Sequence, residues 1–348
     1  MKFYLLSIPL AFILFSSCQK NNLNPVEFKA AEYNDKAKKA SYANTGTSAL
    51  IIDKSPDLIK IYMRTGRNGN RWILLNYKHD VLLDMPDDYN PPPGTKPPAQ
   101  GYNIWHFRQA AEAYRTGEYT FDTDNTLLCQ NGEWEFAVLN NSSKDYSGGS
   151  LHGWEVKNSF SLRVDNVYPR ENSPFKKECD QITIVQNSDV YMPNTVDLLA
   201  NITKNYTIKR DSIILKIDVR WARNIGLSSL KFGMLPASRK SNGKQVTKFG
   251  TRTVNGVVSA VVDITQPFFK PANILSSFNP NTSKIKIWGD DFVASVERVQ
   301  NPALSTSGMT VSESSSYNKI YPDFTGVTSV VTGQKYTMTA RYYLGFKK

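Results

Sequence analysis

The segment from Gly132 to Lys157 holds the side chains of this chain that are best suited to acid–base chemistry. It carries Glu133, His152 and Glu155, and imidazole and carboxyl groups are the side chains that most often move protons in active sites. Two carboxylates beside an aromatic platform are also typical of sites that process sugars. We therefore predict that His152 and Glu155 are catalytic and that Glu133 positions the substrate.

Two tryptophans in the same segment complete the predicted site. Trp134 and Trp154 each stand beside a glutamate in the sequence, and their flat apolar rings could stack on sugar faces. The alternative is a surface turn with its charged residues in solvent and its tryptophans in the core, because large aromatic side chains are mostly buried. Both interpretations stay open at this level.

Two later clusters carry groups that could break an acidic polysaccharide by β-elimination. A phenol can move protons, and a cation can neutralise the carboxylate of a uronate. Tyr317 is therefore predicted as a catalytic acid or base, with Arg239 and Lys319 as neutralising and substrate-binding cations. The alternative is an ordinary strand tyrosine and two surface charges. Only convergence with His152 in space would favour the catalytic interpretation.

The sequence contains no recognisable metal-ligand pattern. The chain has three histidines, so a three-histidine site would need His79, His106 and His152 together. The cysteines Cys129 and Cys179 lack zinc-site spacing, and in an exported chain we predict that they form a disulfide. The alternative is two buried free thiols. No metal site is predicted, and the identity of any cofactor is unknown.

The elements that position the predicted site are expected to be strands. Residues 133–138 partly alternate between polar and apolar types, and a second strand is expected from His152. A pair of glycines ends the polar stretch between them, since glycine accepts positive φ without steric cost. We predict a hairpin here. A bulge at Gly153 would be needed for His152 and Glu155 to share one site.

The rest of the folded part is predicted to be all-β, a large β-sandwich. Aromatic residues make up 12% of the chain, and short β-branched runs alternate with glycine, asparagine and proline. The clearest hairpin joins 59–63 to 72–77 through an Asn-Gly turn. A supersandwich-like pair of large sheets is one form that this fold could take. Further strands are predicted at 159–164, 181–185, 212–219, 257–264, 284–288 and 336–343.

Two segments depart from this strand pattern. The stretch WHFRQAAEAYR, 105–115, is the one short helix predicted, because its apolar residues recur at helical spacing. The stretch PDDYNPPPGTKPP, 86–98, is expected to be a loop, since its prolines cannot donate to a sheet. It is either a mobile flap or an insertion, and we favour an insertion.

An export leader is predicted at the N-terminus. A basic start precedes an apolar run that is too short for a stable membrane span, and small residues precede Cys18. The segment Phe15–Cys18 resembles a bacterial lipobox, which implies lipidation of Cys18 and a bacterial cell envelope location, on the outer membrane or cell surface. The alternative is an ordinary secretory leader. We predict a signal peptide over 1–17, a flexible tether over 18–48 and a β-sandwich domain over 49–348.

Charge and motifs narrow the functional classes. The formal net charge of +11 favours anionic partners such as acidic polysaccharides, although a generally basic exported protein would show it too. The basic residues are spread along the chain without a nucleic-acid motif, so specific nucleic-acid binding is not predicted. Fingerprints of GxSxG hydrolases, HExxH metalloproteases, P-loops and Rossmann folds are absent.

The all-β pattern with GEWE at 132–135 and GGSLHGWE at 148–155 resembles carbohydrate-active sandwich proteins. This resemblance implies a glycan-directed protein, and the residue types favour a polysaccharide lyase. The alternative is a non-catalytic carbohydrate-binding or adhesion lipoprotein. The predicted partners are a polysaccharide and, through the N-terminal lipid, a membrane.

Overall fold

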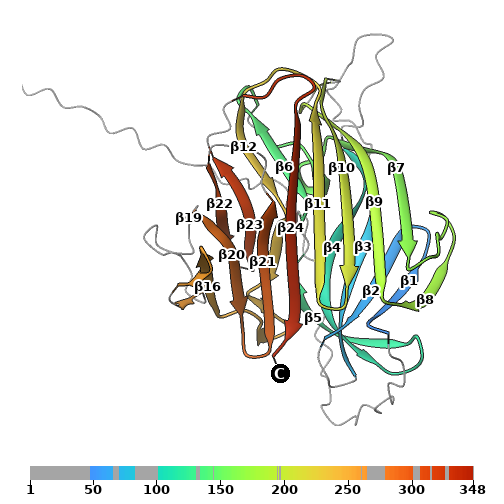
Figure 1. Cartoon of the computed structure of the whole chain (residues 1–348). Helices are drawn as coiled ribbons and strands as arrows, with labels where there is room; N and C mark the ends of the chain where they lie inside the picture. Colours follow the sequence, from blue (N-terminus) through green and yellow to red (C-terminus); the bar gives the residue numbers. More distant parts are fainter. Residues whose placement is uncertain are drawn as a thin grey trace, which may run out of the picture. The chain divides into compact units, whose positions relative to one another are not determined.

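A computed structural model describes residues 48–65, 70–82, 101–130, 134–143, 145–193, 195, 197–259, 261–264, 279–300, 306–313, 316–325 and 329–347. These residues belong to one compact unit. They form strands β1 to β24 and one helical turn, α1, so the all-β prediction is confirmed (Figure 1). Within the described part of the chain, no helix has the length and apolar character to cross a membrane. The predicted leader and lipidated Cys18, the tether up to residue 47, Glu133 and the proline-rich loop lie outside the described residues.

A first group of strands forms one curved row of antiparallel pairs. Strands β8, β1, β2, β3, β4 and β5 follow one another, and β5 continues to β13. Strands β12 and β13 both pair with β23, β6 pairs with β12, and β22 and β19 follow β23. The bounds are β1 (Leu50–Lys54), β2 (Leu58–Arg64), β3 (Arg71–Leu82), β4 (Tyr102–Arg115), β5 (Phe121–Cys129), β6 (Phe136–Asn140), β8 (Phe175–Cys179), β12 (Leu227–Phe232), β13 (Leu235–Ser238), β19 (Asn279–Pro280), β22 (Thr306–Glu313) and β23 (Tyr317–Thr325).

A second group runs β7-β9-β10-β11-β24-β21-β20-β16, with β18 and β17 beside β16, again antiparallel throughout. Figure 1 shows β7, β9, β10 and β11 side by side. The bounds are β7 (Glu155–Val164), β9 (Gln181–Tyr191), β10 (Leu198–Lys209), β11 (Ser212–Trp221), β16 (Phe249–Val254), β17 (Val257–Val258), β18 (Val262–Asp263), β20 (Thr282–Trp288), β21 (Phe292–Gln300) and β24 (Lys335–Phe346). A separate ribbon pairs β14 (Lys240–Ser241) with β15 (Lys244–Gln245).

The two groups are joined by a short parallel contact between β4 and β7, at Tyr102↔Glu155 and Asn103↔Val156. Their inward side chains form one large apolar cluster that draws on both groups. On β10, for example, Ile202, Tyr206 and Ile208 are buried, whereas Thr203, Asn205 and Thr207 are more exposed. Burying such side chains contributes about 1.5–3 kcal/mol each. The predicted hairpin of 59–63 with 72–77 is confirmed as the β2–β3 pair.

The predicted helix at 105–115 is wrong, because these residues are part of strand β4. Opposite β3, Gln109 pairs with Asn76 and Phe107 with Tyr77, so Arg108 is an extra residue in a β-bulge. A bulge shifts the alternation of faces by one residue. Phe107 and Ala110, three residues apart, therefore both lie in the core. That spacing imitates the period of a helix.

The predicted hairpin around the central glycines is also wrong. Its first half is β6, which pairs with β12, and its second half is β7, which pairs with β9 and β4. The segment between them carries α1 (Gly149–His152) and crosses from one group of strands to the other. Gly148 allows this crossing, because its φ is 110° and an added Cβ would lie 2.8 Å from the carbonyl oxygen of Phe136.

Candidate functional site

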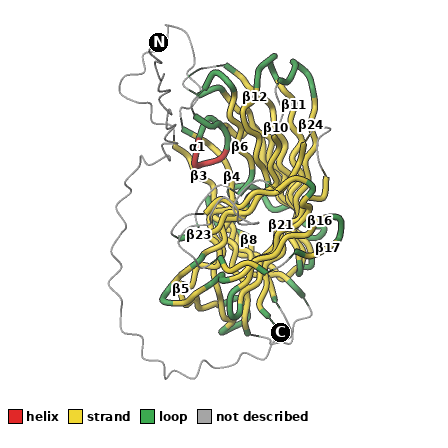
Figure 2. The backbone as a smooth tube through the Cα atoms, turned by 90° about the vertical axis from the view of Figure 1, so that its left-hand side faces the viewer, coloured by secondary structure: helices red, strands yellow, loops and turns green. Residues whose placement is uncertain are grey.

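The polar face that carries the candidate site is the side of the first strand group that points away from the apolar core. Trp105 and Phe107 of β4 both lie in that core, so the residue between them, His106, points to the opposite face. Ala137, Met234 and Tyr321 form a separate small cluster outside the main core. We call this side the outer face. Figure 2 shows α1 next to β6 and β4, and α1 contacts both strands.

A cluster of titratable side chains lies on the outer face around Lys231 of β12. The Lys231 ammonium is 4.9 Å from the ring centroid of Tyr146 and 5.3 Å from that of Tyr321. Asp323 pairs with Lys231 across the β12–β23 ladder, and its Oδ2 accepts a hydrogen bond of 3.0 Å from Thr310. The His152 ring packs against Tyr146 with 4.9 Å between centroids. We call Tyr146, His152, Lys231, Tyr321 and Asp323 the lysine–tyrosine cluster.

Burial and charge set the protonation of this cluster. Burial lowers the pKa of Lys231, but the two phenols and Asp323 outweigh burial, so its pKa is raised above the usual value. Burial raises the pKa of Tyr321 to about 12, against the opposing effect of Lys231. Burial also raises the pKa of Asp323, and Lys231 and Thr310 oppose it only in part. At neutral pH Lys231 is therefore a cation, and the Tyr321 phenol beside it keeps its proton.

His152 reaches this cluster because α1 is fastened from inside the sandwich by Glu155. The buried Glu155 carboxylate accepts a 2.8 Å hydrogen bond from the Gly149 amide at the start of α1. It also forms an ion pair of 2.7 Å with Lys204, and both side chains are fully buried. This geometry corrects the prediction of Glu155 as a catalytic residue. Glu155 is sealed from substrate and positions the segment that carries His152.

The two tryptophans predicted to stack on sugars do not fit that role. Trp134 is fully buried, and its ring packs 5.4 Å from Phe107 in the core. Trp154 is 8% exposed and is held at both backbone ends, by Gly101 and by Tyr191. Their apolar rings contribute to packing, as large aromatic side chains usually do. The alternative interpretation, in which the two tryptophans pack in the core, is therefore the correct one.

The other predicted residues fall partly on the outer face. Strand β23 pairs without a bulge, so Tyr317 and Lys319 share the face of Tyr321. A strand rises about 6.7 Å per two residues, so Tyr317 and Tyr321 lie about 13 Å apart along β23. Arg239 is buried in the bend after β13, where its amide donates to the Ser316 carbonyl. The structure thus places Tyr317 opposite Ser238 on β13, while the His152 ring lies against Tyr146.

The predicted disulfide is wrong, because Cys129 and Cys179 are both free and buried. Cys129 ends β5 and Cys179 ends β8, with strands β1, β2, β3 and β4 between them in the row. At ~4.8 Å per strand this separation far exceeds the Cα distance of about 4.4–6.8 Å in a disulfide. Burial raises the pKa of both thiols, that of Cys179 to about 12.

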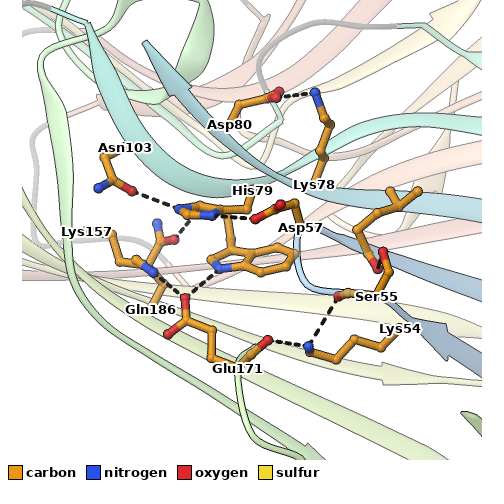
Figure 3. A network of polar contacts seen from close by, with 12 residues as sticks. Lys54, Ser55, Asp57, Lys78, His79, Asp80, Asn103, Lys157, Glu171 and Gln186 are labelled. Carbon is orange, nitrogen blue, oxygen red and sulfur yellow. Dashed lines mark hydrogen bonds and ion pairs between the residues drawn. The ribbon is translucent and has the colours of Figure 1, made fainter. Parts of the chain in front are cut away.

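A second polar network, near the β4–β7 contact, contains His79 (Figure 3). His79 Nδ1 lies 3.2 Å from Asp57 Oδ1, and Nε2 lies 2.8 Å from Asn103 Oδ1. Glu171 accepts from the Trp105 indole at 3.0 Å and also contacts Lys157. Each of these groups is paired within the network, which ties β3 and β4 to β7 and to the loop after it. Such pairing indicates a structural tie.

Within the described residues, no group of three or more His, Cys, Asp or Glu side chains is placed to hold a metal ion. Sequence reasoning missed Lys231, Tyr146 and Asp323 as site residues. The only available signal was the alternation of 317–323, which places Tyr321 and Asp323 on the face of Tyr317. Lys231 and Tyr146 join through pairing between distant strands, which no local pattern reveals.

No known family profile and no curated protein matches the chain. Several solved structures resemble it weakly. A protein assigned as an aldose 1-epimerase from Escherichia coli K12 is 11% identical, with a TM-score of 0.32 over 69% of this chain and 96% of that one. A heparan sulfate lyase mutant from Pedobacter heparinus is 8% identical, with a TM-score of 0.35 over 85% of this chain and 37% of that one.

A glycoside hydrolase family 97 enzyme from Pseudoalteromonas sp. strain K8, in complex with panose, is 8% identical, with a TM-score of 0.39 over 81% of this chain and 35% of that one. The chain therefore spans about a third of the length of the lyase and of the hydrolase. All three TM-scores are below 0.5, so these likenesses assign no function to this chain.

Proposed function

We propose that the chain is a glycan-directed enzyme that breaks acidic polysaccharides by β-elimination on the outer face. The observation that carries this proposal is the Lys231 ammonium between Tyr146 and Tyr321, with His152 against Tyr146. A cation beside phenol and imidazole groups is the set of functions that uronate elimination requires.

Each group has a role in the proposed reaction. Lys231 neutralises the uronate carboxylate, which makes the neighbouring carbon acidic. The half-buried imidazole of His152 takes the proton from that carbon, and the half-buried phenol of Tyr146 donates a proton to the departing glycosidic oxygen. The bond between that oxygen and the ring carbon breaks, which leaves an unsaturated uronate. Tyr321 and Asp323 are more deeply buried and hold Lys231 in place.

The test is an assay of the purified chain against a panel of uronate-containing polysaccharides, following the absorbance of the unsaturated product. His152→Ala and Tyr146→Phe should each lower the rate by about 10²–10⁴-fold, because each removes a proton-transfer group. Tyr343→Phe is the matched control, since Tyr343 is an exposed tyrosine on β24. The absence of product from every uronate polysaccharide would refute the proposal.

A non-catalytic carbohydrate-binding protein is less well supported by the described residues. The tryptophans that would have offered stacking platforms are packed in the interior. This second function would be favoured if the parent protein bound a polysaccharide without turnover and Lys231→Gln lost that binding. The same polysaccharide panel therefore separates the two.

We also propose that Cys18 is lipidated and that the protein is anchored at a bacterial cell envelope. The support is the resemblance of Phe15-Ser16-Ser17-Cys18 to a lipobox after a short apolar run. Expression with a radiolabelled fatty acid should label the chain and place it in the membrane fraction. Cys18→Ala should abolish both. Labelling that persists in Cys18→Ala would contradict the proposal.

A further inference from the structure

A serine, a histidine and an aspartate form a hydrogen-bonded chain beside the lysine–tyrosine cluster. The Nε2 atom of His106 lies 2.9 Å from Asp80 Oδ2, and its Nδ1 lies 3.2 Å from the hydroxyl oxygen of Ser150. An ionised carboxylate can only accept a hydrogen bond, so an imidazole with a single proton carries it on Nε2. The lone pair of Nδ1 then faces the Ser150 hydroxyl.

Two cations also contact the Asp80 carboxylate. Arg108 Nη1 donates to Asp80 Oδ2 at 2.8 Å, and Lys78 forms an ion pair with the same carboxylate (Figure 3). Burial alone would raise the pKa of Asp80, but hydrogen bonds from His106 and Lys78 outweigh burial and hold it well below its usual value. The carboxylate therefore keeps the imidazole in one tautomer and one orientation.

Burial divides the chain into a hidden and an accessible part. His106 is 1% exposed, whereas Ser150 is half-buried at the second position of α1. A nucleophile within reach of a base, and a base oriented by a third group, is the arrangement that activates a serine hydroxyl. The order along the chain is Asp80, His106, Ser150, and such triads are recognised by geometry and not by order.

We propose that Ser150 is a nucleophile that accepts the acyl group of a carboxylic ester. The Ser150 oxygen attacks the ester carbonyl while its proton passes to His106 Nδ1, and Asp80 acts as a positioning residue. The bond between the carbonyl carbon and the ester oxygen then breaks, and the alcohol leaves with the proton from His106. Water, deprotonated by His106, attacks the acyl-serine, so that carboxylic acid and free Ser150 are regenerated. This activity is independent of the elimination proposed above.

The test uses the full chain, a fluorophosphonate probe and p-nitrophenyl acetate. The probe should label the native protein at Ser150, as located by peptide mapping, and Ser150→Ala should abolish both labelling and ester hydrolysis. Ser161→Ala, which removes an exposed serine on β7, should change neither. His106→Gln and Asp80→Asn should each slow labelling by about 10²-fold or more, because both remove activation of the hydroxyl.

Urea unfolding accompanies each variant, because His106 is buried and its replacement could disturb the strand. If His106→Gln does not fold, Asp80→Asn at its partly exposed position supplies the same comparison. A native protein that is not labelled, labelling that maps to another residue, or equal labelling rates in folded Asp80→Asn and the parent protein would each overturn the proposal. In those cases the hydrogen-bonded chain only fastens α1 to β4.

Discussion

Lys231 shows how a single residue can acquire a chemical role from its neighbours. It lies on a short strand, and nothing in the local sequence SSLKFG distinguishes it from an ordinary surface lysine. The structure places it opposite Asp323 and between two phenols. These neighbours raise its pKa against the effect of burial. A lysine that stays charged in a partly desolvated place is suited to meet a substrate carboxylate.

Asp323 should lower the stability of the protein as the pH rises. Its folded pKa lies above the unfolded value of 3.8 because of burial. The stabilising contribution of protonated Asp323 is fully present below the unfolded pKa. It is lost as the pH rises through the folded pKa, because the buried carboxyl must then ionise. Urea unfolding from about pH 4 to about pH 8 should therefore show Asp323→Asn gaining stability relative to the parent protein as the pH rises.

Asp211→Asn, at an exposed turn position between β10 and β11, is the matched control for the loss of a negative charge. A stability difference for Asp323→Asn that stays constant over the same pH range would contradict the raised pKa. A difference that shrinks with rising pH would show that Lys231 dominates over burial at this carboxyl.

The strand that carries these residues was predictable from the sequence, but the surroundings of their side chains were not. The run 317–321 was correctly interpreted as part of a tyrosine-bearing strand, because alternation is a local pattern. The residues that surround its tyrosines were not predictable, for a physical reason. Tyr321 meets Lys231 through the β12–β23 pair, across about ninety residues of chain, and Glu155 meets Lys204 in the interior.

At the scale of elements, α1 depends on contacts with the rest of the fold for its position. It is only four residues long, and an isolated helix of that length has no stability in water. Its place depends on Glu155, which accepts from the Gly149 amide while paired with Lys204. His152 and Ser150 project from this one turn toward Tyr146 and His106. The buried ion pair therefore positions both proposed sites at once.

Lys204→Met should destabilise the protein by about 3–5 kcal/mol, because it leaves the Glu155 carboxylate buried without its cation. Lys204→Met combined with Glu155→Gln should recover much of that loss, since no unpaired charge remains. Urea unfolding of both single variants and the double variant gives the coupling energy directly. The exposed Lys209→Met on the same strand is the control for the lost charge.

Additive effects of the two substitutions would contradict this account of the ion pair. The catalytic consequence is separate: the double variant should fold but lose β-elimination activity, because the carboxamide holds the Gly149 amide less firmly than a carboxylate. A double variant with full stability and full activity would show that α1 is positioned by other contacts.

Strand β4 explains where local sequence patterns fail for whole elements. Its bulge at Arg108 puts Phe107 and Ala110 on one face, and the run of alanines and glutamate has high helix propensity. Tertiary pairing with β3 and β5 overrides that propensity. Other strands were predictable because polar and apolar residues alternate in them without a bulge, or because their residues have strong β-propensity. These are the strands at 159–164, 212–219 and 336–343.

At the scale of the whole molecule, the all-β class followed from composition and punctuation, whereas the order of strands did not. Strand β1 pairs with β8, and β11 pairs with β24, so neighbours in space are far apart in the sequence. Such pairing is specified by complementary faces and shared burial rather than by short motifs. The outer face, and with it the candidate site, exists only after these distant strands have met.

The net charge of +11 should draw anionic polysaccharides to the molecule independently of the chemistry at Lys231. The Debye length falls from about 10 Å at 0.1 M salt to about 3 Å at 1 M salt. Binding of a uronate polysaccharide should therefore weaken by about tenfold or more over this range, whereas a neutral glucan should show little salt dependence. Lys231→Gln removes one charge of many, so it should keep most of the salt-dependent binding while losing turnover. If Lys231→Gln lost binding and turnover equally, Lys231 itself would supply the affinity. If binding of the polysaccharide did not depend on salt, the overall charge would contribute nothing to binding.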